Sequence, residues 1–296
     1  EKDLTLFQKL EKIFGKTLGI ILNLLLTILF FLYFSYMLWS VNTYIQNKYL
    51  NSTPSIIIIL LFLIPTVWCV LTDMKTLSKV SLSLFFITLF MIIFSISNLF
   101  IKIDLENFKP LFNIKLTPLL KTSLIYTSYF VTPTFMMITV PKNMIYDSKN
   151  LTKTVTKLYI FSSINFLLLF IFIIGIFGID LAKQFSYPEY TLMKKVNYFD
   201  FIQHIENITT IQWLYCLFIS NVMSLNFIKE YLKHINHYKY KIFIPIILIA
   251  LILSLNLFKN TTVAYTFVTH YYHYIYSVPI VIILLLSCII IKTKNT

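Results

Sequence analysis

The sequence predicts an all-α polytopic membrane protein with about eight transmembrane helices, and three observations carry this prediction. Of its 296 residues 58% are hydrophobic and only 12% are charged, whereas soluble globular domains carry about 25% charged residues. The apolar residues come in blocks of about 20, the length that a helix needs to cross a lipid bilayer. Lysines cluster in alternate connections between these blocks. Together these patterns exclude a soluble domain and a disordered chain.

The apolar blocks follow one another along the chain and define the predicted spans. Because a backbone in lipid must satisfy its own hydrogen bonds, each block is predicted to be a helix. We assign the whole chain, residues 1–296, to a single integral membrane domain. The first block is too long for a signal-peptide core and has no small-residue cleavage site after it, so it is predicted to stay in the membrane. The spans are about 17–45, 54–71, 77–101, 119–140, 158–179, 208–227, 242–258 and 272–291.

The distribution of lysine predicts the orientation. All 25 basic residues other than histidine are lysines, and 16 of them lie on the side of the membrane that holds the N-terminus. Because lysine-rich loops stay in the cytoplasm, both termini are predicted to be cytoplasmic. The absence of arginine argues against a surface that reads nucleic acid, since arginine is the usual ligand of bases and phosphates. We therefore predict no nucleic-acid partner.

Three connections between the spans have features of their own. Residues 102–118 and 180–207 are predicted to be long external loops. Within the second loop, residues 198–206 place apolar side chains at helical spacing, which predicts a short helix at the membrane surface. The basic segment 229–241 is predicted to be a cytoplasmic loop that contacts anionic lipid headgroups.

Inside the spans the polar residues are neutral, and the fourth span has the most suggestive group. No span has an acidic residue or a lysine near its centre, which disfavours a proton-driven pump. Pro133 lies in the fourth span between Thr132 and Thr134. Proline removes a backbone donor and leaves a carbonyl unpaired, and broken helices of this kind form binding sites in many transporters. The alternative, favoured by the proline alone, is a plain kink whose freed carbonyl is satisfied by Thr132 or by a neighbouring helix.

The sequence offers little support for an enzyme or for a metal site. It has only four glycines, too few for a phosphate-binding loop, and no hydrolase elbow or HExxH motif. No acid and no third ligand accompany His234 and His237, whereas a zinc site needs three or four ligands. A second pair, His270 and His273, lies in an aromatic stretch typical of a membrane interface. We predict no catalytic activity, no metal and no cofactor.

Three segments together resemble a known family. The stretch 187–213 contains a Tyr-Pro pair, a Phe-Ile pair, a glutamate and a tryptophan in the family's order, at Tyr187, Pro188, Phe201, Ile202, Ile205, Glu206 and Trp213. Gln203 and His204 replace the Glu-Arg pair of the family. Residues 4–19 look like the family's lead into its third helix, and residues 105–121 look like its loop into the sixth. The chain resembles the B-subunit family of spore germinant receptors, the GerAB type.

The resemblance implies a permease-like fold, that of the amino-acid permease superfamily (LeuT-like), in which ten helices form two inverted five-helix repeats. The eight predicted spans then correspond to family helices three to ten, and two leading helices precede them in the family. The family's pocket draws on its first, third, sixth and eighth helices, so this chain would lack one wall. The sixth helix falls on residues 119–140, where residues 130–134 (FVTPT) stand in place of a Phe-x-Gly-x-Glu-like break. The ligand-binding residues that the resemblance implies are Tyr33, Thr132, Pro133, Thr134 and Ser220.

The function that the resemblance implies is that of a sensor. A membrane subunit of a spore germinant receptor would bind a small nutrient, typically an amino acid, in the inner membrane of the spore and trigger germination. Its partners would be the receptor's A subunit and its lipid-anchored C subunit. Two alternatives stay open: a transporter of amino acids or cations, and a structural subunit that binds no ligand. The absent glutamate and the missing first helix favour the structural alternative.

Overall fold

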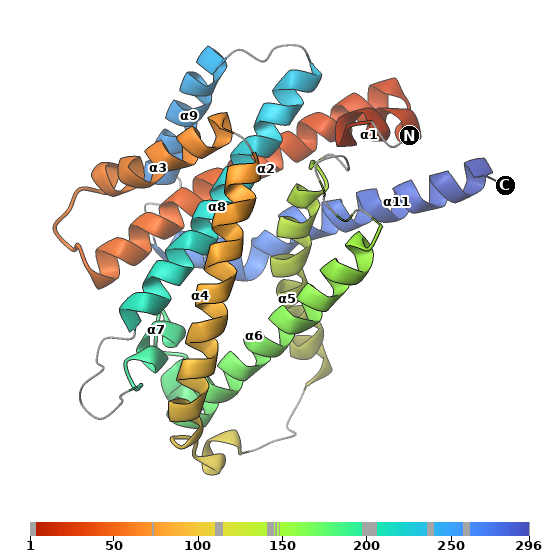
Figure 1. Cartoon of the computed structure of the whole chain (residues 1–296). Coiled ribbons are helices and arrows are strands. Elements are labelled where there is room, and N and C mark those ends of the chain that lie inside the picture. The colour runs from red at the N-terminus through yellow and green to blue at the C-terminus, as the bar shows by residue number, and fades with distance from the viewer. Residues whose placement is uncertain are drawn as a thin grey trace. The chain divides into compact units, whose positions relative to one another are not determined.

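The structure is a computed structural model, and every regular element in the residues that it describes is helical (Figure 1). It describes residues 4–72, 74–109, 115–140, 145, 147, 149–196, 206–235, 240–256 and 261–295, and no strand occurs among them. The α-helices are α1 (Leu6–Phe14), α2 (Lys16–Lys48), α3 (Ser55–Leu71), α4 (Met74–Phe100), α5 (Leu116–Met137), α6 (Leu151–Ala182), α7 (Pro188–Met193), α8 (Glu206–His234), α9 (Phe243–Asn256), α10 (Thr261–Thr266) and α11 (Val278–Asn295). The shorter turns are the 3-10 helices η1 (Leu105–Phe108) and η3 (Tyr240–Ile242) and the π-helical segments η4 (Phe267–Tyr271) and η5 (His273–Ser277).

Five helical segments are long and apolar enough to cross a membrane, which confirms the prediction of a helical chain with membrane-spanning segments. They are Lys16–Lys48, Leu77–Phe100, Leu151–Ala182, Thr209–His234 and Tyr274–Thr293, and α3 and α9 are shorter apolar helices. Each overlaps a span predicted from the sequence. The remaining predicted span coincides with α5, whose 22 residues include Lys121 and a run of serines and threonines that lower its hydropathy. The number of crossings stays a prediction.

Contacts divide the chain into two compact units. Unit 1 comprises residues 1–74, 115–146 and 217–296, and unit 2 comprises residues 75–114 and 147–216. Each unit is therefore built from segments that lie far apart in the sequence. The assignment of the chain to one membrane domain stays a prediction.

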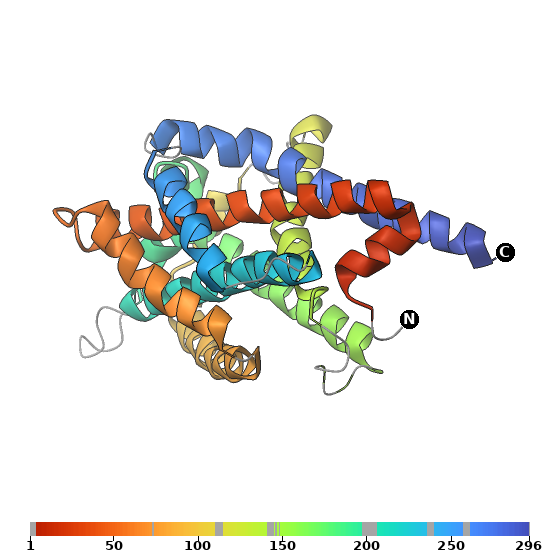
Figure 2. The same cartoon turned by 90° about the horizontal axis from the view of Figure 1, so that it is seen from above.

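In unit 1 the chain begins with a tight helical hairpin that the sequence analysis did not predict. The Thr5 hydroxyl accepts a hydrogen bond from the backbone of Gln8, and the Gln8 side chain accepts one from the backbone of Thr5, so the two form a capping box. Gly15, with φ of 86°, makes the turn into α2. A Cβ on Gly19 would lie 2.4 Å from the Cα of Glu11, so only glycine allows α1 to lie this close to α2. Figure 2 shows α1 folded back beside the start of α2.

The core of unit 1 is aromatic and joins α2, α5 and α8. The Phe30 ring lies 6.1 Å from the Phe135 ring and 4.4 Å from the Phe227 ring, measured between centroids. All three side chains are fully buried. Their contacts hold α5 and the C-terminal half of α8 against α2. On another side of α2, α3 and α9 pack against it and against each other (Figure 1).

Unit 2 contains α4, α6 and α7, and a bend in α6 fixes the segment that follows α4. Gly178 has φ of 71° and ψ of 166°, which interrupts the helix. The Gly175 carbonyl accepts hydrogen bonds from the backbone N–H of Asp104 and from Nδ2 of Asn107, both at 2.9 Å. Residues 102–109, the first part of the predicted external loop, are thereby attached to α6.

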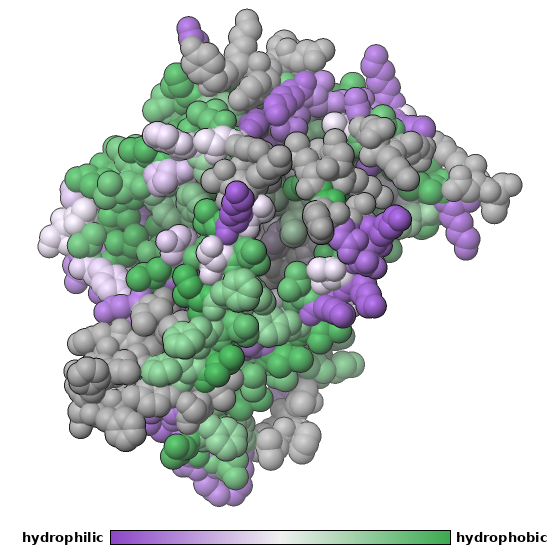
Figure 3. All heavy atoms as spheres, viewed as in Figure 1, coloured by the Kyte–Doolittle hydropathy of each residue, from purple (hydrophilic) through white to green (hydrophobic). Residues whose placement is uncertain are grey.

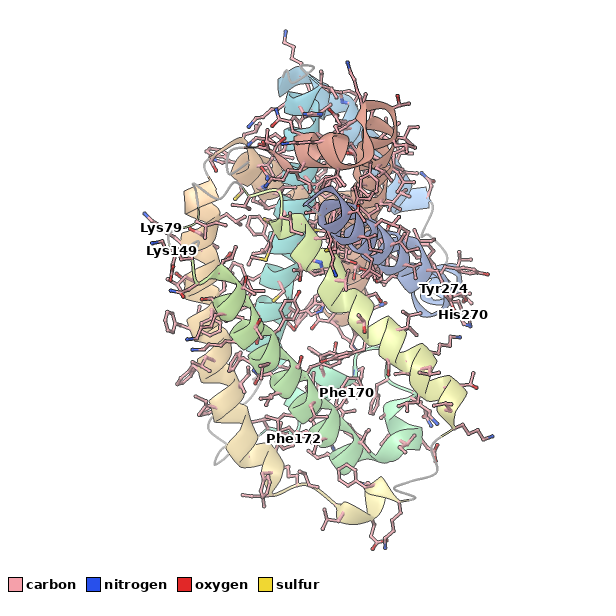
Figure 4. The ribbon with its side chains drawn as sticks, turned by 90° about the vertical axis from the view of Figure 1, so that its right-hand side faces the viewer. Lys79, Lys149, Phe170, Phe172, His270 and Tyr274 are labelled. Carbon is pink, nitrogen blue, oxygen red and sulfur yellow. The ribbon has the colours of Figure 1, made fainter. Side chains whose placement is uncertain are left out.

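The two ends of unit 2 differ in character. Figure 4 shows Lys79 of α4 and Lys149, just before α6, close together at one end, with Phe172 of α6 toward the other end. Between the ends, the exposed side chains of α4 are mainly apolar and include Leu82, Phe86 and Phe90. Figure 3 shows apolar side chains gathered over this face of α4, as expected for a helix in contact with lipid.

Several loop predictions need correction or lie outside the described residues. The predicted loop 180–207 contains α7, which the sequence analysis missed. Of the predicted surface helix 198–206, only Glu206 is described, and it is the first residue of α8. The predicted basic loop 229–241 begins as helix, because α8 continues to His234. Lys229 is buried and donates a hydrogen bond to the Val70 carbonyl at the end of α3, so its assignment to lipid headgroups is wrong.

Candidate functional site

Tyr33, the predicted site residue on α2, lies in a cluster of buried tyrosines. Its ring centroid is 5.9 Å from that of Tyr276 and 6.3 Å from that of Tyr272, and these two rings are 4.8 Å apart. All three side chains are buried. They bring the middle of α2 against the π-helical segments η4 and η5.

The π-helical segments have one buried and one exposed face. His270 and Tyr274 are exposed, and Figure 4 shows them side by side on the outside. Tyr272 and Tyr276 point inward. The interpretation of residues 269–274 as an interfacial aromatic belt is therefore wrong for Tyr272. π-Helical turns are rare and often occur at functional sites.

On α5 the three predicted site residues have different environments. Thr132 is fully buried, Pro133 is exposed and Thr134 is partly buried. The helix continues through Pro133 and ends one turn later at Met137, so α5 is not unwound at the proline. The Thr132 hydroxyl has no hydrogen-bond partner. The suggestion that Thr132 satisfies the carbonyl freed by the proline is therefore wrong.

Among the buried side chains that the structure describes, an unpaired hydroxyl is unusual. Ser128, one turn before Thr132 on α5, is also fully buried, and its hydroxyl donates to the Ile125 carbonyl at 2.6 Å. The hydroxyl of Thr139, just after α5, donates to the Met136 carbonyl at 2.7 Å. Hydroxyls inside helices commonly bond to a carbonyl one turn earlier in this way. Thr132 departs from this pattern.

On α8 the residue with an unpaired buried atom is Asn221, the neighbour of the predicted Ser220. Ser220 is partly buried, and its carbonyl accepts a hydrogen bond from the Ser224 hydroxyl at 2.7 Å. Asn221 is fully buried and donates from Nδ2 to the Leu217 carbonyl at 2.9 Å, while its Oδ1 has no partner. Asn221 lies within the predicted span 208–227 but is not one of the predicted site residues.

The predicted site residues lie close to the contacts that join their helices. Phe30 of α2 packs on Phe135 of α5. Tyr33 lies three residues after Phe30, and Thr132 lies three residues before Phe135. Ser220 is one turn before Ser224, whose hydroxyl lies 3.5 Å from the sulfur of Met136 on α5. The structure therefore brings together the three helices that carry the predicted site. The predicted site residues Tyr33, Thr132, Thr134 and Ser220 offer hydroxyl groups, and the neighbouring Asn221 offers an amide.

The histidine at the end of α8 does have an acid beside it, contrary to the sequence analysis. Nε2 of His234 lies 2.6 Å from Oε1 of Glu11 on α1, and Nδ2 of Asn23 lies 3.3 Å from the same oxygen. His237 is outside the described residues. Within the described part of the chain no group of three or more His, Cys, Asp or Glu residues is placed to hold a metal ion. The Glu11–His234 pair connects helices and has too few ligands for zinc.

Comparison with protein families identifies the chain. The family described as spore germination protein matches residues 1–264. The chain belongs to the spore germination protein family. Members are permease-like membrane subunits of germinant receptors, and the family is not known as an enzyme family. No curated protein and no solved structure matches the chain.

Membership of the spore germination family confirms the resemblance that the sequence motifs indicated. Together with the long apolar helices, it points to an integral membrane protein in a germinant receptor. The matched range includes Tyr33, Thr132, Pro133, Thr134 and Ser220. It ends before η4, so both π-helical segments lie beyond it.

Proposed function

We propose that this spore germination protein is the nutrient-sensing subunit of its receptor and binds a small nutrient, typically an amino acid, in the interior of unit 1. The binding groups are the hydroxyls of Thr132 and Thr134 and the backbone around Pro133, whose own side chain is exposed, with Tyr33 and Ser220 on facing helices. The observation that carries the proposal is the fully buried, unpaired hydroxyl of Thr132 beside the proline. Family membership supports the receptor context.

The Thr132 hydroxyl makes no hydrogen bond within the protein, and this lowers the stability of the ligand-free state. A buried donor or acceptor without a partner costs about 1–3 kcal/mol. A ligand that forms a hydrogen bond with the Thr132 hydroxyl removes this cost. It does so only in conformations in which the site is closed around the ligand. Such differential affinity is what allows a ligand to shift the balance between two states of a protein. The sensor acts with the receptor's A and C subunits in the inner membrane of the spore, with both termini in the cytoplasm.

The test is a germination assay on spores that carry substitutions in α5. Thr132→Val and Thr134→Val are each expected to raise the nutrient concentration required for half-maximal germination, because each removes a hydroxyl at nearly constant volume. The matched control is Ser128→Ala, which removes a buried hydroxyl that is paired within the helix. An unchanged dose response of both threonine variants, with normal abundance of the subunit, would contradict the site assignment.

One observation favours a second function, that of a structural subunit without a ligand. α5 remains helical through Pro133, so it does not have the unwound backbone typical of binding sites in permeases. A binding titration on the assembled receptor separates the two functions, because a structural subunit predicts no change when Thr132 is replaced. Accumulation of labelled substrate by vesicles that contain this chain alone would instead support transport.

A further inference from the structure

The last apolar segment of the chain changes its winding before it becomes an ordinary α-helix. η4 and η5 are π-helical, and α11 begins directly after them at Val278. Ser277 is the last residue of η5 and is 1% exposed. Ser277 directly follows Tyr276, whose ring contacts that of Tyr33.

Ser277 shares with Thr132 a property that is rare in the described part of the chain. Both residues are buried, and the hydroxyl of neither has a hydrogen-bond partner. The other buried side-chain atoms without a partner are amide oxygens of asparagines whose Nδ2 atoms donate hydrogen bonds, namely Asn23, Asn42 and Asn221. By contrast, the buried hydroxyl of Ser254 donates to the Leu251 carbonyl at 2.8 Å. The hydroxyls of Ser277 and Thr132 therefore make no hydrogen bond within the described part of the chain.

The two unpaired hydroxyls belong to elements that pack against each other. α5, which carries Thr132, is in contact with η5, which carries Ser277. α2 contacts both elements, because its Tyr33 packs on Tyr276, next to Ser277, and its Phe30 packs on Phe135, three residues after Thr132. Because a hydroxyl can both donate and accept, the pair suits a ligand group that needs hydrogen bonds from two sides.

The charges around these residues restrict the ligand. Apart from Lys229, the described side chains that unit 1 buries are uncharged. The one buried charged side chain among its described residues is Lys229, which donates to the Val70 carbonyl on α3. Among the described side chains, a ligand with a net charge would find no opposite charge at Thr132 and Ser277, and burying an uncompensated charge is very unfavourable.

We propose that Thr132 of α5 and Ser277 of η5 hold a net-neutral, hydrogen-bonding ligand, such as a zwitterionic amino acid, from two sides. This inference rests on the proposed sensing function and adds a wall of the site that lies outside the range matched by the family. Ser277 acts by direct hydrogen bonding to the ligand.

The experiment measures germination of spores that carry Ser277→Ala, Thr132→Val or both. The probes are the common L-amino acids tested one at a time, followed by the amide and the N-acetyl derivative of any active one. Ser277→Ala is expected to raise the half-maximal concentration by about tenfold, the change that about 1.4 kcal/mol of binding free energy produces. The double variant is expected to show less than the product of the two single effects, because both hydroxyls bind one ligand. The charged derivatives are expected to be inactive.

Two controls separate binding from folding. Ser254→Ala removes a buried but paired hydroxyl and is expected to leave the dose response unchanged. Thermal unfolding of each purified variant verifies that the fold is retained.

The outcomes distinguish this inference from the proposed function on which it rests. If Thr132→Val shifts the dose response and a correctly folded Ser277→Ala does not, the role of Ser277 is overturned while the sensing site stands. If the amide or N-acetyl derivative is as active as its parent, the requirement for a net-neutral ligand is overturned. If no probe acts through this subunit and neither variant alters germination, the sensing function itself fails.

Discussion

Thr132 and Ser128 lie one turn apart on α5 and are equally buried, but only Ser128 has a partner for its hydroxyl. This difference separates a contribution to stability from a contribution to binding. A buried hydroxyl that is paired stabilises the fold modestly, whereas one without a partner destabilises it. The two residues should therefore respond in opposite ways to loss of the hydroxyl.

We predict that Thr132→Val leaves the thermal stability of the purified protein unchanged or raises it, because the variant removes an unpaired buried group. Ser128→Ala is expected to lower the free energy of unfolding by about 1 kcal/mol. Thermal unfolding in detergent micelles without ligand measures both effects. A larger loss of stability in Thr132→Val than in Ser128→Ala would show that the Thr132 hydroxyl is paired within the protein.

At this scale the sequence indicated part of the candidate site. Thr132 was predicted as a site residue because it adjoins Pro133, which is a local signal in the sequence. Ser277 and Asn221 were not selected as site residues, since nothing in their neighbourhood separates them from other polar residues in apolar spans. What distinguishes them is that each has a buried side-chain oxygen without a hydrogen-bond partner. This results from packing between α5, α8 and η5, which the local sequence does not reveal.

Among the elements, the hairpin of α1 and α2 is the clearest example of a structure that depends on one small residue. Gly19 permits the close approach of α1, and Phe7 of α1 then packs on Phe227, Tyr231 and His234 of α8, with ring centroids 5.3–5.6 Å apart. Nδ2 of Asn23 on α2 donates to the Phe7 carbonyl at 3.2 Å. α1 therefore connects the beginning of α2 with the end of α8.

We predict that Gly19→Ala displaces α1 from α2, because the added methyl group would lie 2.4 Å from the Glu11 backbone. Overpacking of this kind typically costs about 1–3 kcal/mol. Limited proteolysis is expected to cleave α1 faster in this variant. The control is Leu18→Ala, which shortens an exposed neighbouring side chain. Equal cleavage rates in Gly19→Ala and the natural protein would contradict the close packing of the hairpin.

The sequence contained the signals for α1, since the capping box and Gly15 are both local patterns. The contact between Glu11 and His234 could not be predicted in this way. The two residues are separated by 223 positions, and no periodicity relates them. The same holds for the attachment of residues 102–109 to the Gly175 carbonyl, which depends on the bend at Gly178.

For the whole molecule, the apolar blocks were sufficient to predict the helical fold class and the approximate position of each long helix. The grouping of these helices into two units could not be predicted, because each unit combines segments that are distant in the sequence. The lysine distribution adds an orientation that the helices alone do not provide. Lys79 and Lys149 lie at the same end of unit 2, as that orientation requires (Figure 4).

We predict that cysteines introduced as Lys79→Cys and Lys149→Cys react with a membrane-impermeant reagent only from the cytoplasmic side. Lys109→Cys, beyond the other end of α4, is expected to react only from the opposite side. The measurement uses sealed vesicles of known orientation and a background in which Cys69, Cys216 and Cys288 are replaced. Labelling of Lys79→Cys and Lys109→Cys from one side would show that α4 does not cross the membrane.

The hydrogen bond from Lys229 to the Val70 carbonyl makes it possible to detect movement of α8 by tryptophan fluorescence. It fastens the C-terminal end of α3 to α8, so a tilt of α8 transmits its motion to that end. Trp68 lies two residues before Val70 and is 72% exposed, and its indole would sense the displacement. A variant that retains Trp68 as its single indole would therefore report movement of α8 as a change in emission wavelength, without any attached dye.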